Sequence, residues 1–143
     1  MSTLKVDTYL TRGGASEIAI DKLKGVTAAG SMLVVAEGGT NTTNLQQGLC
    51  KAWCLGAIDA ALVDSFNISG GTDNGTGDYT YAFSTNFGSN NIAPSGNCVS
   101  DENVILVYTQ GALLSSAYRV ELRNDSTGDQ NEINSTNICG DLA

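Results

Sequence analysis

The chain has 143 residues, of which 41% are hydrophobic and 15% are charged, and its net charge is −8. This length predicts one domain that can bury a hydrophobic core, and the low charged fraction, with abundant Gly, Ser, Thr and Asn, favours a turn-rich β protein over a cytosolic enzyme. An acidic surface argues against nucleic-acid binding, and no stretch approaches the roughly 20 apolar residues of a transmembrane helix.

The first 48 residues predict an extended segment with few large side chains. Leu4 and Val6 alternate with polar residues, as do Ile18 and Ile20, which is the period-two pattern of strands. A monomer would leave these four side chains exposed, so we expect residues 1–48 to attach the protein and to form oligomers by burying them between copies. The opening residues lack the apolar stretch of a signal peptide, which predicts synthesis in a cytoplasm.

Residues 49–143 predict a β-rich head domain. A strand is expected first, with Leu49, Trp53 and Leu55 on one side, and the next stretch, Ala57–Val63, fits either a helical turn or a strand. Trp53 is expected in the core, because aromatic side chains dominate buried area.

A hairpin is expected next. Phe66–Ser69 and Asp78–Ser84 have strand patterns, and the cluster of Gly, Asn and Asp at Gly70–Gly77 predicts the turn between them. Tyr79 and Tyr81 share one face of the second strand and are expected in the core.

The remaining chain predicts a loop and three more strands. The loop covers Phe87–Asn97, and the strands cover Val104–Thr109, Ala117–Arg123 and Gln130–Ile138. Short strands separated by turn signals predict an all-β fold, an antiparallel β-sandwich-like head behind the extended N-terminal segment.

The sequence lacks the residues of the common catalytic machineries. It contains no histidine, which excludes Ser-His-Asp and Cys-His catalysis, and it contains no nucleotide-binding P-loop. Carboxylates could in principle act in pairs on a glycan, but no spacing selects a pair among them. The candidates are Asp59, Asp64, Asp73, Asp78, Asp101 and Glu102. We therefore expect no catalytic residue and no enzymatic activity.

No metal or cofactor is expected either. Asp73–Asp78 offers oxygen ligands on a turn, but the glutamate and flanking helices of an EF-hand are missing. The simpler interpretation is that Asp73 and Asn74 hydrogen-bond their own backbone while Gly75 adopts a positive φ.

Four cysteines are present, and they lack the Cys-x2-Cys spacing of zinc sites. They are Cys50, Cys54, Cys98 and Cys139. Four cysteines allow three disulfide pairings, and the sequence alone selects none. We expect buried thiols, with oxidation after release from the cell left open.

Several segments resemble small tail-fibre-like proteins of phages that infect marine and freshwater bacteria, including cyanophage-like ones. Met1–Thr8 resembles the start of such proteins, and Cys139–Ala143 resembles their close. Their C-terminal domain is similar to three segments here: Lys51–Trp53, Asp64–Ser69 and Thr72–Thr80. The four cysteines and the stretch Cys54–Val63 depart from this pattern.

The resemblance implies a virion protein that forms a homotrimeric appendage with other virion proteins, without a cofactor or a catalytic residue. Contact with a glycan or protein of the host surface would use loops, because binding residues concentrate on loops over a rigid scaffold. The candidates are Asp73, Asn74, Thr76, Asn90 and Asn91. Two alternatives stay open: a capsid or neck decoration protein, which the short length favours, and a glycan depolymerase, which is the weakest.

Overall fold

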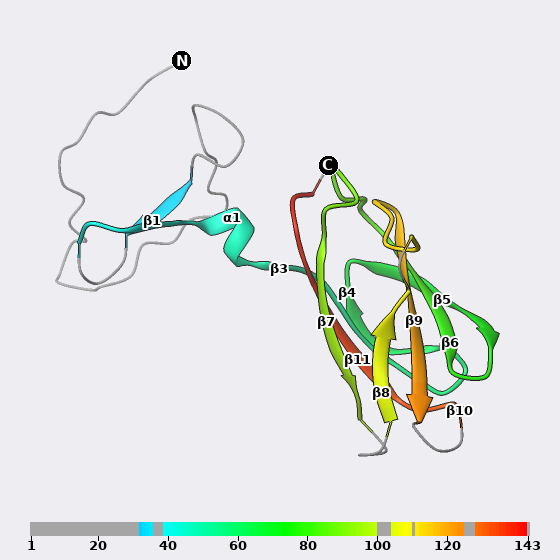
Figure 1. The fold of residues 1–143 in the computed structure, drawn as a ribbon. Coiled ribbons are helices and arrows are strands. Elements are labelled where there is room, and N and C mark those ends of the chain that lie inside the picture. The colour runs from blue at the N-terminus through cyan, green and yellow to red at the C-terminus, as the bar shows by residue number, and fades with distance from the viewer. Residues whose placement is uncertain (1–31, 36–38, 100–103, 110, 125–127, 143) are drawn as a thin grey trace, which may run out of the picture.

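A computed structural model describes residues 32–35, 39–99, 104–109, 111–124 and 128–142. Figure 1 shows two antiparallel sheets packed face to face, with one short helix ahead of them. The fold is all-β, as the sequence predicts. Leu4, Val6, Ile18 and Ile20 lie outside the described residues.

Three small elements precede the sandwich. β1 (Leu33–Val35) pairs with β2 (Thr42–Asn44), and α1 (Leu45–Gly48) follows directly. All three side chains of β1 are exposed, including Val35 at 59%. The apolar residues Leu33–Val35 therefore form a strand whose side chains are not buried by any other described residue.

The first sheet of the sandwich has four strands in the order β4-β3-β11-β7. They are β3 (Cys50–Gly56), β4 (Leu62–Phe66), β7 (Ala93–Cys98) and β11 (Asn134–Cys139). β3 and β11 form the centre and run antiparallel, so that the start of one lies beside the end of the other. This arrangement gives the sandwich a Cys50 end, which also holds Cys139, and a Gly56 end, which also holds Asn134.

The second sheet has five strands centred on β9. They are β5 (Ile68–Gly75), β6 (Asp78–Phe83), β8 (Val104–Tyr108), β9 (Ala117–Asn124) and β10 (Gly128–Asp129). β8 pairs with one edge of β9, while β6 and then β10 pair with the other edge. The β5–β6 turn lies at the Gly56 end, because the Tyr79 hydroxyl donates to the carbonyl O of Ile58 at 2.8 Å.

Two strands lie where the sequence predicts turn or loop. Gly70–Gly77 is mostly strand β5, and the tight turn is confined to Thr76 and Gly77. The predicted loop Phe87–Asn97 contains most of β7. Both strands are the outermost of their sheets, where glycine, proline and polar residues are tolerated because one side makes no ladder hydrogen bonds. Ala57–Val63 resolves into a turn followed by the first residues of β4.

Asn67 turns the chain from the first sheet to the second. Its φ of 57° lies in the left-handed region, which asparagine tolerates better than most residues. Its side-chain amide donates to the carbonyl O of Lys51 and of Thr85, both at 3.1 Å, and its Oδ1 accepts from the Thr85 N–H at 2.7 Å. One side chain therefore fixes the corner and ties it to two other segments.

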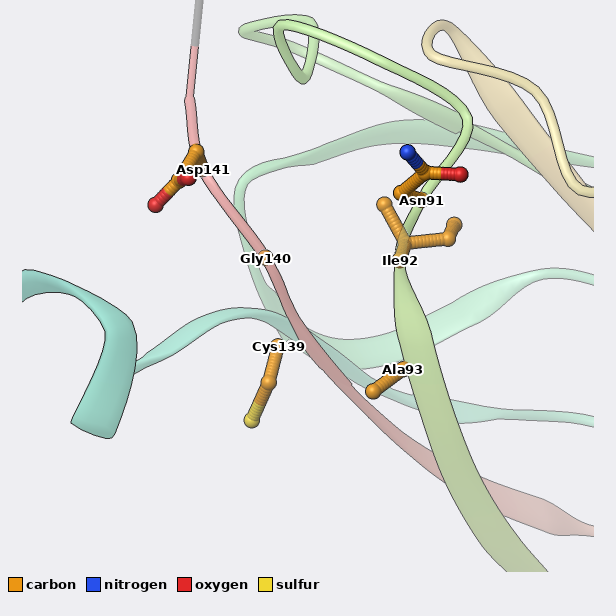
Figure 2. Close-up of a pocket in the computed structure, with 6 residues that line it drawn as sticks. All are labelled: Asn91, Ile92, Ala93, Cys139, Gly140 and Asp141. Carbon is orange, nitrogen blue, oxygen red and sulfur yellow. The ribbon is translucent and has the colours of Figure 1, made fainter.

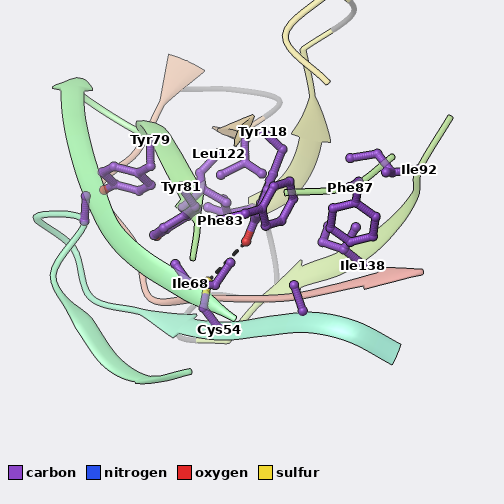
Figure 3. Packing of buried hydrophobic residues seen from close by; sticks show 14 residues of the cluster. Cys54, Ile68, Tyr79, Tyr81, Phe83, Phe87, Ile92, Tyr118, Leu122 and Ile138 are labelled. Carbon is purple, nitrogen blue, oxygen red and sulfur yellow. Dashed lines mark hydrogen bonds between the residues drawn. The ribbon is translucent and has the colours of Figure 1, made fainter. Parts of the chain in front are cut away.

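The core lies between the sheets, as the alternation in β6 and β9 predicts (Figure 3). Its largest fully buried side chains are Tyr79, Tyr81, Tyr118, Leu122 and Ile138. Tyr118 on β9 reaches across the sandwich, where its hydroxyl lies 2.6 Å from Thr136 Oγ1 and 3.3 Å from Cys54 Sγ. Tyr81 on β6 likewise donates to Asn134 Oδ1 at 3.1 Å. Tyrosines of one sheet thus hydrogen-bond polar groups of the other.

Two predictions about burial are wrong. Trp53 is only partly buried and faces outward, because its neighbours Ala52 and Cys54 fill the inner face of β3. Of the four cysteines only Cys54 is buried: Cys50 is exposed, and Cys98 and Cys139 are intermediate. Cys98 packs against the edge of the core, and Cys50 and Cys139 lie at strand ends.

The buried tyrosines predict a loss of stability in alkali. Burial raises the pKa of Tyr81 and Tyr118 well above the usual value and raises that of Tyr79 to about 12. Unfolded tyrosines ionise near pH 10, so the stabilisation is complete below about pH 10 and is lost as pH rises toward 12. Urea unfolding measured across this range should show a falling free energy of unfolding. The fall should be shallower for Tyr79→Phe, and a flat profile in the parent chain would contradict the assignment.

Neighbouring glycines on β5 provide a matched pair of tests. A Cβ at Gly71 would lie 2.0 Å from the carbonyl O of Ala60, whereas a Cβ at Gly70 meets nothing within 4 Å. Gly71→Ala should therefore destabilise the fold by about 1–3 kcal/mol through overpacking. Gly70→Ala should be neutral or stabilise by up to about 1 kcal/mol, since it restricts the unfolded chain. Urea midpoints measure both, and equal midpoints would refute the close packing at Gly71.

Candidate interaction surface

The outer face of the five-stranded sheet carries ion pairs. Arg119 on β9 donates from Nε to Asp78 Oδ1 on β6 at 2.6 Å, and this hydrogen bond lowers the pKa of Asp78. Glu121 pairs with Arg123 and accepts a hydrogen bond from Thr109 Oγ1 at 2.9 Å. Such a face is compatible with contact with water.

The outer face of the four-stranded sheet is different. The inward residues of β3 and β11 are almost fully buried, so the alternate residues point outward. Trp53 lies opposite Phe66 on one neighbouring strand and opposite Asn137 on the other. Phe66 is 52% exposed. We call this surface the Trp53 face; its members are Lys51, Trp53, Leu55, Asp64, Phe66, Ser95, Asn97, Ser135 and Asn137.

Charge is nearly absent from this sheet. Its four strands contain only Lys51 and Asp64, which have opposite signs, although the chain as a whole carries a net charge of −8. A neutral face with exposed aromatic side chains resembles the centre of protein interfaces, where charged residues are depleted and aromatic residues are enriched. Contact with another protein surface is the interaction for which the Trp53 face is suited.

The first group of predicted contact residues lies at the β5–β6 turn, at the Gly56 end. Asp73 Oδ1 accepts the backbone N–H of Gly75 at 2.9 Å, and Gly75 has a positive φ, as the sequence predicts. Asn74 instead donates from its side chain to Thr80 Oγ1 at 2.9 Å. Asp73 and Asn74 therefore stabilise the hairpin, and both they and Thr76 are exposed.

The second group lies in the β6–β7 connection, at the Cys50 end. Asn90 Oδ1 accepts the backbone N–H of Ser115 at 2.8 Å and so joins this connection to the β8–β9 connection. Asn91 lines a shallow hollow of about 430 Å³ (Figure 2). Ile92, Ala93, Cys139, Gly140 and Asp141 form the rest of its wall. The two predicted groups lie at opposite ends of the sandwich, so they do not form one site.

The four described carboxylates among the glycan-hydrolysis candidates each have a partner close by in the structure. Asp59, Asp64 and Asp73 each accept a backbone N–H one or two residues further along the chain. Asp78 pairs with Arg119, and Asp101 and Glu102 lie outside the described residues. Each of the four described candidates therefore has a local partner, a backbone N–H or a guanidinium group.

Within the part of the chain that the structure describes, no three His, Cys, Asp or Glu side chains come close enough to hold a metal ion. The helix in this part of the chain is too short to span a membrane.

The Trp53 face was not predicted as an interaction surface, because the sequence analysis placed Trp53 in the core. The available signal was the alternation of the small residues Ala52, Cys54 and Gly56 along β3. Their side of the strand, which is the side away from Trp53, is the tightly packed one. Comparison of the chain with protein-family models, curated proteins and solved structures gave no match.

Proposed function

We propose that the chain is a non-enzymatic structural module of a bacteriophage particle, a tail-fibre-like appendage that assembles as a homotrimer with other virion proteins. The observation that supports assembly most directly is the Trp53 face, an aromatic and almost uncharged surface on an acidic chain. The link to a phage particle rests on the resemblance of Met1–Thr8, Thr72–Thr80 and Cys139–Ala143 to tail-fibre-like proteins.

Burial of the Trp53 face between copies would remove exposed aromatic area from water. Trp53 and Phe66 lie side by side on adjacent strands, so a single contact buries both. Tryptophan is among the residues that contribute most to binding energy at interfaces. Copies that carry a charge of −8 repel one another, and a sheet with one positive and one negative side chain is where they can approach most closely.

The N-terminal residues would support the same assembly. The chain reaches the sandwich at Cys50, so residues 1–48 lead into the central strand of the sheet that carries the Trp53 face. Oligomerisation through Leu4, Val6, Ile18 and Ile20 would hold the head domains together at high effective concentration. A modest interaction between the Trp53 faces would then be sufficient.

Host contact would be restricted to one end of the head. If residues 1–48 attach the module to the particle, the Cys50 end faces the particle and the Gly56 end faces outward. Asp73, Asn74 and Thr76 lie at the outward end, whereas Asn90 and Asn91 lie at the attached end. We therefore propose the β5–β6 turn, and not Asn90 and Asn91, for host contact.

The first test is the oligomeric state of Trp53 and Phe66 variants. Light scattering should give the parent chain a mass three times the 14.8 kDa of one chain. Trp53→Ser with Phe66→Ser should shift the species toward monomer at micromolar concentration, because truncation of one interface hot spot costs about 2 kcal/mol or more. Deletion of residues 1–25 should also give monomers.

Ile105→Ser is the matched control, because Ile105 is 63% exposed on the other sheet. It should leave the mass unchanged. A parent chain that is monomeric, or a double variant that stays trimeric while remaining folded by circular dichroism, would refute assembly through the Trp53 face.

The second test is the position of the chain on the particle. Immunogold labelling of intact virions with an antibody to this chain should place gold on the tail or its fibres. Gold over the head or neck would contradict the appendage and support a decoration protein. If gold labels neither the tail nor the head, and the chain is absent from purified particles, the chain is not a virion protein.

A further inference from the structure

Cys50 and Cys139 lie directly opposite each other on the central strands of the four-stranded sheet. We infer that these two thiols are the site of an intrachain disulfide that forms when the protein meets an oxidant. This inference does not depend on the proposed phage role, since it follows from the pairing of β3 with β11.

The register of the two strands pairs Cys50 with Cys139 in the range of separations that a disulfide needs, if the spacing of regular pairs applies at this register shift. Directly opposed residues of antiparallel strands have Cα atoms about 4.5–5.5 Å apart, and a disulfide needs about 4.4–6.8 Å. The register shifts between Ile138 and Cys139, which brings Cys50 rather than Lys51 opposite Cys139. Cys50 Sγ already lies 3.6 Å from the carbonyl O of Ile138, the residue bonded to Cys139. The same sulfur donates to the carbonyl O of Ala52 on its own strand at 3.0 Å, so it lies between β3 and β11.

The other two cysteines are badly placed for either thiol. Cys98 lies opposite Asn134, five residues from Cys139 along β11, which is about 17 Å. Cys54 lies four residues from Cys50 along β3, about 13 Å, and its side chain is buried against Tyr118 and Thr136. Cys54 and Cys98 are also separated from each other, because β11 lies between β3 and β7. Among the four cysteines, the fold therefore supports the pairing of Cys50 with Cys139.

A small-molecule disulfide such as oxidised glutathione can supply the oxidation. The exposed thiol of Cys50, as its thiolate, attacks one glutathione sulfur and releases a glutathione thiolate, forming a mixed disulfide. The Cys139 thiolate then attacks the Cys50 sulfur and releases the second glutathione thiolate. The protein loses two electrons to the glutathione disulfide, and its two thiol protons end on the two glutathione molecules. Burial raises the pKa of Cys54, which keeps that thiol protonated and unreactive.

The disulfide would fasten the first and last strands of the sandwich at the Cys50 end. It would close a loop that includes nearly the whole head domain, and long loops lose the most unfolded-state entropy. The oxidised chain should therefore melt about 10 °C above the reduced chain. A protein that leaves a reducing cytoplasm would gain this stability only outside it.

Trypsin digestion without reduction tests the pairing. Cleavage after Lys24, Lys51, Arg119 and Arg123 gives three cysteine-containing peptides: 25–51 with Cys50, 52–119 with Cys54 and Cys98, and 124–143 with Cys139. After treatment of the full chain with oxidised glutathione, mass spectrometry should find 25–51 linked to 124–143. Peptide 52–119 should be recovered unlinked, with both of its thiols available to an alkylating agent after denaturation.

Matched variants distinguish this disulfide from general oxidation. Cys50→Ser and Cys139→Ser should each abolish both the linked peptide and the rise in melting temperature, whereas Cys98→Ser should abolish neither. If a variant fails to fold, the presence or absence of the link between peptides 25–51 and 124–143 in the parent chain still tests the inference. Absence of the link after oxidation, a link that includes 52–119, or disulfide-bonded dimers on a non-reducing gel would each overturn the inference.

Discussion

The fold depends on the fit between large tyrosines on one sheet and small residues on the other. Tyr81 and Tyr118 cross the sandwich to reach β3 and β11, and the inner face of β3 consists of Ala52, Cys54 and Gly56. A Cβ at Gly56 would lie 1.9 Å from the Tyr81 hydroxyl, so no larger residue fits there. Apolar packing alone leaves the stacking of two sheets weakly specified. Directed hydroxyl bonds at 2.6–3.1 Å fix which residue of one sheet faces which residue of the other.

This fit determines the outer surface as well. Successive residues of a strand point to opposite faces, so a strand that keeps its small residues inside must present its large ones outside. β3 thus directs Trp53 and Leu55 away from the core, and β4 places Phe66 beside Trp53. The other sheet shows the reverse pattern, with tyrosines inside and Arg119, Glu121 and Arg123 outside. The same packing rule therefore gives the sandwich one face with ion pairs beside Ile105 and Val107 and one face with exposed aromatic side chains, and the second is better suited to a dry contact with another protein.

The sequence was sufficient for the fold class and for the tyrosine-rich strands, because Tyr79, Tyr81, Tyr118 and Leu122 alternate with polar residues. It was insufficient for β3, where both faces are apolar and hydrophobicity cannot say which is inside; side-chain size decides, and that depends on the partner sheet. It was also insufficient for the edge strands β5 and β7, which contain turn-forming residues and become strands only through pairing with β6 and β11. The sequence could suggest two groups of candidate contact residues, but it could not show that they lie at opposite ends of the sandwich, because their separation follows from the direction of β6.

The order of the strands gives the head a polarity that fits an appendage. The first strand starts and the last strand ends at the Cys50 end, where Asn67 turns the chain between the sheets and where residues 1–48 join. The β5–β6 turn, held by Asp73 and Asn74, lies at the opposite end. The Trp53 face belongs to a sheet that spans the two ends, so association through it would proceed side by side and leave both ends accessible. In the proposed role, attachment, lateral assembly and outward contact would therefore use three separate surfaces, and a change in one of them need not disturb the others.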